Sequence, residues 1–379
     1  MDNRHINYQF KFLYALGMVF IVAGHTKGGG FSLFYDWFPV IAFHLGLFMF
    51  ASGYFYRQAN ENNISGFLWK KVKRLIIPLY MWNVVYGIFC YLTKSFGWLH
   101  IGGDLTLRNL LIVPILTGHQ FGYNLCAWFL IPLFMVHVYF VITRKTVSKI
   151  FGGGNEWIYF IFSCIIGLVG IYIARSGYNR GWFLVLDRFL YFVPFYSAGI
   201  LYHQKLEQSD NLKNFYYFGF IGLSILAIVC VHGSVPGYVP AWCRDFGKSN
   251  IFMPLVVGGL GIAFWLRVSR IMTPAIRESS IINKIADNTW SIMMHQFMGF
   301  MLCKAIFYYV SLNTLLFHDF NAVKFKSYIW YYYFPNNRHQ FAILYLIAGI
   351  VVPLIIHWLV KKLQMKLAVY KWFKWCAYL

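Results

Sequence analysis

Long apolar runs recur along the whole chain, separated by short polar segments. A helix of about 20 mostly apolar residues spans the roughly 30 Å hydrocarbon core of a bilayer. By this criterion the pattern predicts ten membrane-spanning helices, near residues 10–27, 36–56, 75–96, 124–143, 157–175, 183–202, 214–232, 251–268, 289–311 and 341–360. The predicted fold is therefore an all-α polytopic integral membrane protein, in which residues 1–379 form a single membrane-embedded domain.

The segments between the predicted helices alternate in character. Every second segment carries Lys and Arg, whereas the segments between these are rich in Gly and aromatic residues. Because Lys and Arg are concentrated in cytoplasmic loops, both chain ends are expected in the cytoplasm. The longest outer segment, 312–340, is either a lid or acceptor platform over a site or part of an interfacial aromatic belt. Its aromatic residues include Tyr328, Trp330, Tyr331, Tyr332 and Tyr333.

The composition excludes a soluble enzyme and a nucleic-acid-binding protein. Hydrophobic residues make up 59% of the chain and charged residues 12%, whereas soluble domains carry about 25% charged residues. The net charge of +21 is scattered between the apolar runs and forms no basic face. The seven cysteines show no metal-binding spacing and are interpreted as buried small hydrophobic residues, so no metal is expected. No cleavage site follows the first apolar run, which is expected to remain as a helix.

Three polar residues share one face of the first predicted helix. Counting about 100° per residue from His25, Tyr14 lies about 20° and Lys11 about 40° off its azimuth, with the imidazole about 16 to 21 Å further along the axis. Ionisable residues within a bilayer commonly mark functional sites. A neutral imidazole in this place can act as a general base toward a hydroxyl. The alternative interpretation is an interfacial histidine with a snorkelling lysine.

The second predicted helix offers further polar groups. Asp36 stands at its outer start, and it either orients His25 across a glycine-rich loop or is a helix-start carboxylate at the water interface. His44 lies in the same outer half of the membrane as His25. Ser52 and Gly53, near the cytoplasmic end, are small enough to let another helix approach closely.

A basic stretch precedes the third predicted helix. Lys71 and Arg74 are one helical turn apart, and an arginine can bind a phosphate through two hydrogen bonds. The stretch is therefore either a clamp for the phosphates of an anionic cytoplasmic donor or charge that orients the helix and contacts lipid head groups. In the sixth predicted helix, Asp187 is expected to neutralise Arg188.

Four segments carry motifs at the ends of the first four predicted helices. They are Gly24-His25-Thr26, the stretch from Phe43-His44 to Ser52-Gly53-Tyr54, Arg74-Leu75-Ile76-Ile77-Pro78, and Ala127-Trp128-Phe129-Leu130-Ile131-Pro132. In this order they resemble the acyltransferase-3 family of integral membrane acyltransferases, most closely its single-domain sugar and polysaccharide O-acetyltransferases. A weaker similarity lies at residues 288–296, which contain His295. This segment is similar to a late helix of the family that has a histidine near its middle.

The resemblance implies roles for the residues that match. His25 looks like the catalytic histidine of the family, and Lys71-x-x-Arg74 resembles its acyl-CoA-binding Arg-x-x-Arg. One departure is that Tyr14 stands where the family has Arg or Lys. Either Lys11, one turn earlier on the same face, supplies that charge, or the Tyr14 phenol takes its place. The candidate site then consists of the catalytic His25, of Asp36, His44 and His295 as orienting or acceptor-side residues, and of Lys11, Tyr14, Ser52, Lys71, Arg74 and Trp128 on the donor side.

Together these observations predict a membrane O-acyltransferase. It would move an acyl group, most simply acetyl from acetyl-CoA, from the cytoplasm to a hydroxyl of a cell-surface glycan or its lipid-linked precursor. His25 would act as general base or be acylated transiently, and the sequence leaves this open. No permanently bound cofactor and no nucleic acid is expected. The expected partners are the bilayer, acyl-CoA and the glycan, and a homo-oligomer is left open. The expected location is the bacterial cytoplasmic membrane, and the alternative function is a lipid-linked sugar or polysaccharide flippase or exporter.

Overall fold

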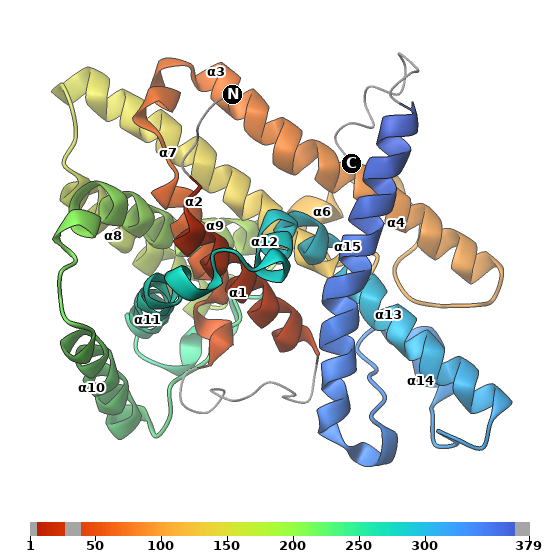
Figure 1. The fold of residues 1–379 in the computed structure, drawn as a ribbon. Helices are drawn as coiled ribbons and strands as arrows, with labels where there is room; N and C mark the ends of the chain where they lie inside the picture. Colours follow the sequence, from red (N-terminus) through yellow and green to blue (C-terminus); the bar gives the residue numbers. More distant parts are fainter. Residues whose placement is uncertain (1–5, 27–38, 368–379) are drawn as a thin grey trace. The chain divides into compact units, whose positions relative to one another are not determined.

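The computed structural model describes residues 6–26 and 39–367, and within them the chain forms helices and no strand (Figure 1). In chain order the α-helices are α1 (Tyr8–His25), α2 (His44–Tyr54), α3 (Ile64–Lys71), α4 (Ile77–Ser95), α5 (Leu107–Leu111), α6 (Val113–Leu116), α7 (Leu130–Phe151), α8 (Glu156–Arg175), α9 (Gly181–Leu201), α10 (Asn214–His232), α11 (Met253–Ile276), α12 (Ser280–Asp287), α13 (Thr289–Asn313), α14 (Ala322–Ser327) and α15 (Ala342–Leu367). The predicted all-α class is confirmed.

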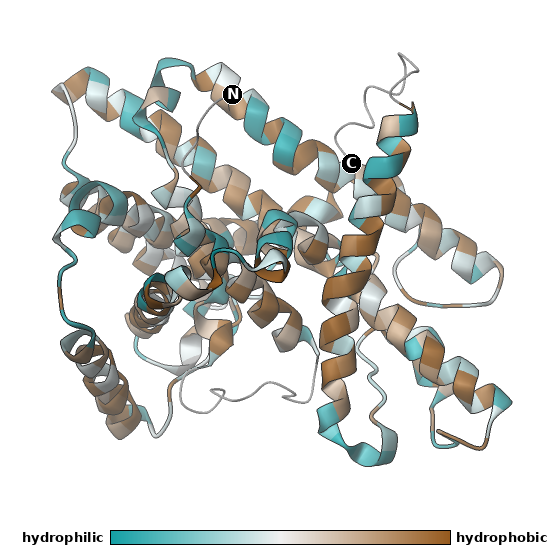
Figure 2. Cartoon of the chain, viewed as in Figure 1, coloured by the Kyte–Doolittle hydropathy of each residue, from teal (hydrophilic) through white to brown (hydrophobic). Residues whose placement is uncertain are grey.

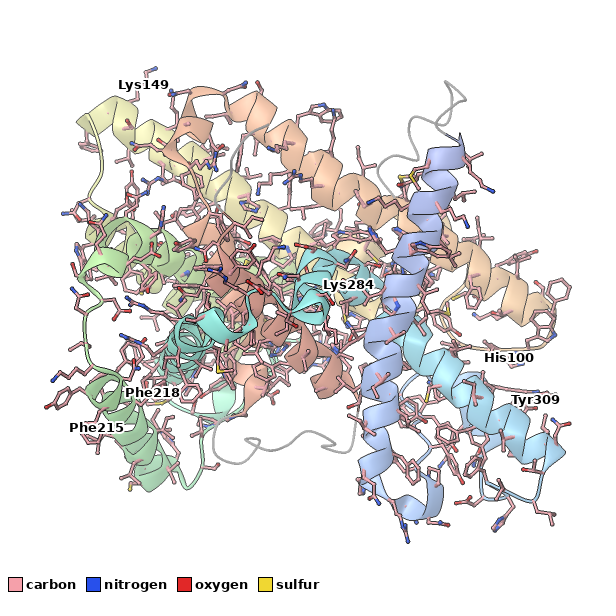
Figure 3. All side chains as sticks on the ribbon, in the orientation of Figure 1. His100, Lys149, Phe215, Phe218, Lys284 and Tyr309 are labelled. Carbon is pink, nitrogen blue, oxygen red and sulfur yellow. The ribbon has the colours of Figure 1, made fainter. Side chains whose placement is uncertain are left out.

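Helices of membrane-spanning length and polarity are present, as the hydrophobic pattern predicted. Within the described residues seven helical segments meet this description, at Ile64–Ser95, Leu125–Phe151, Glu156–Arg175, Gly181–Ser209, Asn214–His232, Met253–Ile276 and His339–Leu367. The last is apolar along its middle and hydrophilic at both ends (Figure 2). In α10 the side chain of Phe215 projects outward, and it is 82% exposed (Figure 3). Apolar side chains exposed on long helices are expected where lipid is the solvent. The protein is therefore a polytopic membrane protein, and the cytoplasmic chain ends stay a prediction.

The helix predicted at 36–56 is shorter than expected. Among the described residues it begins only at His44, after a short 3-10 turn at Val40–Ala42, and α2 has 11 residues. Phe43 interrupts the helix with φ of −130°, and Pro39 has no N–H to donate. Eleven residues rise about 16 Å, roughly half of a bilayer core. The prediction of ten spanning helices therefore stays a prediction, with α1, α2 and α13 outside the seven segments.

The chain divides into two compact units, each assembled from separated segments. One unit comprises Met1–Gly17, Leu33–Lys70 and Pro132–Asp287. The other comprises Met18–Ser32, Lys71–Ile131 and Asn288–Leu379. We refer to them as the first and the second unit.

The first unit is held together by close packing of α2 against α9. A Cβ atom at Gly53 would overlap the backbone carbonyl of Tyr196, and one at Gly199 would overlap that of Phe50. Only glycine therefore fits at either place. The prediction that Ser52 and Gly53 permit close helix approach is confirmed in its essential part, at Gly53.

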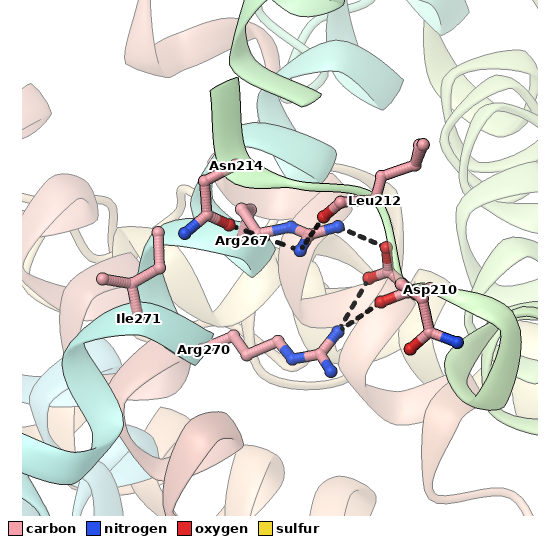
Figure 4. A pocket seen from close by; sticks show the side chains of 7 residues that line it. Asp210, Leu212, Asn214, Arg267, Arg270 and Ile271 are labelled. Carbon is pink, nitrogen blue, oxygen red and sulfur yellow. Dashed lines mark hydrogen bonds and ion pairs between the residues drawn. The ribbon is translucent and has the colours of Figure 1, made fainter. Parts of the chain in front are cut away.

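Buried ion pairs also organise the first unit. Arg144 on α7 lies 2.6 Å from Glu156 on α8 and 3.1 Å from Glu61, with all three side chains at most 7% exposed. Near α10 and α11, Asp210 pairs with the buried Arg267 and, at 3.2 Å, with Arg270, whose side chain is 45% exposed (Figure 4). Removing one partner from such a buried pair is strongly destabilising. We therefore assign both groups to structure.

The predicted pairing of Asp187 with Arg188 is not seen. The Nε–H group of Arg188 donates to the carbonyl of Ala241 at 3.0 Å. Both carboxylate oxygens of Asp187 are buried and accept no hydrogen bond from the described residues. The reason is geometric, because consecutive residues on a helix project about 100° apart.

Candidate active site

The candidate site is built around the last turn of α1, in the second unit. Thr26, which follows the helix, is fully buried, and its hydroxyl donates to the carbonyl of Ala23 at 2.8 Å. This contact closes the C-terminal turn of the helix, where the last carbonyls lack helical partners. His25 is thereby held at a helix end and is half-buried, and no described residue outside α1 comes within 4 Å of a Cβ atom placed on Gly24.

Two side chains meet at the imidazole. The Nδ1 atom of His25 lies 3.1 Å from Oε1 of Gln296, which comes from α13. The Sγ atom of Cys126 lies 3.8 Å from both ring nitrogens. Gln296 and Cys126 also contact each other, with the amide Nε2 3.1 Å from the sulfur. Gln296 is fully buried and Cys126 is 5% exposed, so both are fixed by packing.

These contacts determine how the imidazole carries its proton. The Gln296 amide donates its N–H groups to Cys126 Sγ and, at 3.3 Å, to the carbonyl of Met293. Its oxygen is therefore the group that faces Nδ1, and an amide oxygen can only accept. Nδ1 must then carry the hydrogen, which leaves the lone pair on Nε2. A neutral imidazole in this tautomer is a base at Nε2.

Aromatic residues from the segment 312–340 and from α13 pack around the same imidazole. The ring centroids of Trp330 and Phe297 lie 6.1 and 5.4 Å from that of His25. The Tyr332 hydroxyl donates to the backbone carbonyl of His25 at 2.7 Å. Burial raises the pKa of the Tyr332 phenol well above its usual range, so the phenol keeps this proton. The placement of Trp330 and Tyr332 favours the interpretation of this segment as a lid.

A buried lysine fixes the covering segment. Lys304 on α13 is fully buried, and its ammonium donates to the carbonyl of Ile329 at 2.8 Å. The ammonium also lies 5.4 Å from the ring centroid of Tyr332, within reach of a cation–π interaction. One lysine thus holds the backbone just before Trp330 and the ring of Tyr332.

Gln296, and not its neighbour His295, lies beside the His25 imidazole. His295 is buried, its Nδ1 lies 2.7 Å from the Tyr86 hydroxyl, and its ring lies 4.2 Å from that of Trp82. Adjacent residues of α13 project about 100° apart, so only one of the pair can face His25. That residue is Gln296, so an amide occupies the orienting position beside His25, and an acceptor-side role for His295 stays a prediction.

The predicted donor-side residues of the second unit are Lys71, Arg74 and Trp128. Lys71 ends α3 and is half-buried, and Arg74 is exposed within a π-helical stretch, Val72–Ile76, that leads into α4. Because a π-turn is wider than an α-turn, residues three apart no longer stack on one face as expected for one α-helical turn. Trp128 is buried, and Gly118, at φ of +73°, packs so closely on it that a Cβ there would collide.

The remaining predicted residues belong to the first unit or are not described. Lys11 forms an ion pair with Asp287 at 2.9 Å, and Tyr14 packs its ring 5.6 Å from that of Phe48. Ser52 is half-buried in α2. His44 begins α2, buried, with Nδ1 2.8 Å from the carbonyl of Val40. Asp36 lies outside the described residues.

Three residues of the site escape the sequence patterns. Gln296 and Lys304 are polar residues inside an otherwise apolar helix, which is a signal in itself, since burying such groups in a membrane is costly. Cys126 carries no such signal, because a buried cysteine ordinarily behaves as a small hydrophobic residue. Within residues 6–26 and 39–367, no three His, Cys, Asp or Glu side chains gather in a way that would hold a metal ion.

Comparison with known proteins adds one finding. The model of the acyltransferase-3 family, described as an acyltransferase domain, matches residues 7–359. No curated protein and no solved structure matches the chain. The matched range includes every residue of the candidate site named above.

Proposed function

The chain belongs to the acyltransferase-3 family and is a membrane acyltransferase, and we propose that it uses cytoplasmic acyl-CoA, most simply acetyl-CoA, to acylate a hydroxyl of a cell-surface glycan or its lipid-linked precursor. Family membership favours this enzyme over the flippase or exporter considered as the alternative. The proposed location is the bacterial cytoplasmic membrane, where the donor is available on one side and the glycan on the other.

The observation that carries the proposal is the contact of His25 Nδ1 with Gln296 Oε1. It supports a general base, because it leaves the lone pair on Nε2, which Cys126 Sγ approaches only to 3.8 Å, and this lone pair is what a hydroxyl proton needs. In the proposed reaction Nε2 takes the proton of the acceptor hydroxyl, and the oxygen forms the new ester bond to the acyl carbon. The thioester C–S bond breaks, and the imidazolium returns its proton to the sulfur of CoA.

Gln296 and Cys126 have positioning roles in this proposal. The neutral amide holds Nδ1–H without placing a negative charge beside the ring, so the imidazole stays neutral and basic between turnovers. Cys126 holds the amide in turn. Trp330 and Phe297 limit the access of water to the imidazole, which protects the activated acyl group from hydrolysis.

The donor phosphates would be bound by the basic residues at the start of α4. Arg74 is exposed and able to form paired hydrogen bonds with a phosphate. Lys71 would add a second positive charge from the adjacent turn. Lys11 remains a proposed donor contact, although its ammonium is shared with Asp287 and only 23% of the side chain is exposed.

The function is tested with purified protein in lipid nanodiscs, acetyl-CoA labelled in the acetyl group, and glycan fractions from the producing cell. Transfer of label to one fraction is the expected result, and NMR of that fraction then identifies the acylated hydroxyl. Absence of labelled glycan from any acyl-CoA, with folded protein, would contradict the proposal. A chase with unlabelled donor after stopping the reaction separates direct transfer from a covalent acyl-histidine, which would retain label on the protein.

A further inference from the structure

A buried cluster of neutral polar side chains adjoins the candidate active site in the second unit. Its centre is Asn83 on α4, which is fully buried. The Asn83 amide nitrogen donates to the carbonyls of Asn109 and Leu110, at 3.1 and 2.9 Å. Its oxygen accepts from the amide groups of Gln120 and, at 3.4 Å, of Asn124. All hydrogen-bonding groups of Asn83 are thus used to hold the cluster together.

The other members of the cluster have buried polar atoms without a hydrogen-bond partner among the described residues. Five buried atoms find no hydrogen bond among the described residues: Trp82 Nε1, Gln120 Oε1, Tyr123 OH, Asn124 Oδ1 and Trp290 Nε1. Burying a polar group without a hydrogen bond costs on the order of 1 to 3 kcal/mol. Five such atoms in one place would be a large cost, unless a ligand supplies the missing partners.

Ring contacts make these residues one continuous group. Tyr86 lies 6.0 Å from Trp82 and 6.1 Å from Tyr123, measured between ring centroids. His295 lies 4.2 Å from Trp82 and 6.2 Å from Trp290. The rings of Trp82, Tyr123 and Trp290 therefore belong to one packed group, which comes from α4, the segment before α7 and the start of α13. Gln120 and Asn124 join this group through their hydrogen bonds to Asn83, the chain neighbour of Trp82.

The position of the cluster along the chain shows which functional segments it adjoins. Arg74 precedes Trp82 by eight residues of continuous helix, or about 12 Å of axial rise. At the other side, Asn124 is two residues before Cys126, and His295 directly precedes Gln296. Along the chain, the cluster is thus connected on one side to a basic segment suited to phosphates and on the other to the two residues that contact His25.

We propose that this cluster binds the amide-bearing pantetheine arm of the acyl-CoA donor. The inference rests on the proposed function and names the residues that would recognise the middle of the donor. Two indole N–H donors, two amide oxygens and one phenol form a neutral, mixed set, which matches the N–H and C=O groups of two successive amides. A carbohydrate could bind to the same groups. Acyl-CoA carries the arm and the phosphates in one molecule, so only the donor requires the cluster to be connected to a phosphate-binding segment.

The test compares donors that carry the arm with and without phosphates. Initial rates are measured with acetyl-CoA and with S-acetylpantetheine for the wild type, Tyr123→Phe, Trp82→Phe and the double variant Lys71→Ala/Arg74→Ala. The matched control is Tyr91→Phe, the same change on an exposed face of α4. Competition of pantetheine itself against acetyl-CoA is measured in the wild type, so that one readout needs no variant.

The expected result is that Tyr123→Phe and Trp82→Phe each raise the KM of both donors about three- to tenfold, the effect of one lost hydrogen bond. The double variant should raise the KM for acetyl-CoA only, and Tyr91→Phe should change neither. A change confined to the acceptor KM would assign the cluster to the glycan and overturn the inference. Absence of competition by pantetheine would also overturn it. Neither result touches the proposed function, which fails only if the wild type transfers no acyl group from acyl-CoA.

Discussion

His25 Nδ1 and Gln296 Oε1 lie 3.1 Å apart, although 271 positions separate the two residues in the chain. The contact joins the end of α1 to the beginning of α13. It fixes both the orientation of the imidazole and the nitrogen that carries its proton. A histidine oriented in this way exposes Nε2 as its basic atom, as general-base catalysis requires.

Replacing Gln296 should affect catalysis more than donor binding. Gln296→Ala removes the acceptor for Nδ1–H, and we expect kcat to fall about tenfold, the worth of one lost hydrogen bond, with the donor KM unchanged. Gln296→Glu retains an acceptor but stabilises the imidazolium, so the acid limb of the pH–rate profile should move to higher pH. An unchanged profile with Glu would show that residue 296 does not act through His25.

Replacing Cys126 distinguishes support from nucleophilic catalysis. The sulfur contacts Gln296 and the imidazole, so Cys126→Ala should lower kcat only severalfold, and Cys126→Ser should recover part of the loss by accepting from the amide. The variants are compared at equal protein concentration in the acetyl-transfer assay. Complete inactivity of both would indicate that the thiol itself is acylated.

The ion pair of Lys11 with Asp287 gives a test of the predicted donor contact. The pair is partly exposed, so breaking it should cost less than about 1 kcal/mol of stability. If Lys11 contacts the donor, Lys11→Ala raises the KM for acetyl-CoA, whereas Asp287→Asn frees the ammonium and does not. Tyr14→Phe should have little effect. Loss of activity with Tyr14→Phe alone would transfer the role to the phenol.

Replacing Gly53 by alanine, the smallest possible enlargement of its side chain, is expected to lower the stability of the protein. Gly53→Ala places a methyl group against the backbone carbonyl of Tyr196, which cannot move aside as a side chain would, and overpacking of this kind costs about 1 to 3 kcal/mol. The matched control is Gly219→Ala on α10, where a Cβ meets nothing and helix propensity improves. Thermal unfolding in detergent should show a lower midpoint for Gly53→Ala only, and equal midpoints would contradict the packing found here.

The sequence predicted those features that depend on local pattern. The hydrophobic period located α13 at its first residue, and the Gly-His-Thr motif selected His25 as the end of α1. The sequence could not show whether His295 or Gln296 faces His25, because this depends on the rotation of α13 about its own axis. Nor could it reveal the pairing of Lys11 with Asp287, which joins residues 276 positions apart. The π-turn before α4 also carries no recognisable signal in the sequence.

The central claim is that His25 performs acyl transfer, and the most direct measurement is the initial rate of acetyl transfer by His25→Gln, with CoA binding measured on the same sample. Gln preserves the size and polarity of the side chain but offers no basic nitrogen. The account predicts a rate lower by about 10² to 10⁴ with CoA affinity unchanged. Transfer at the wild-type rate by folded His25→Gln protein would contradict it.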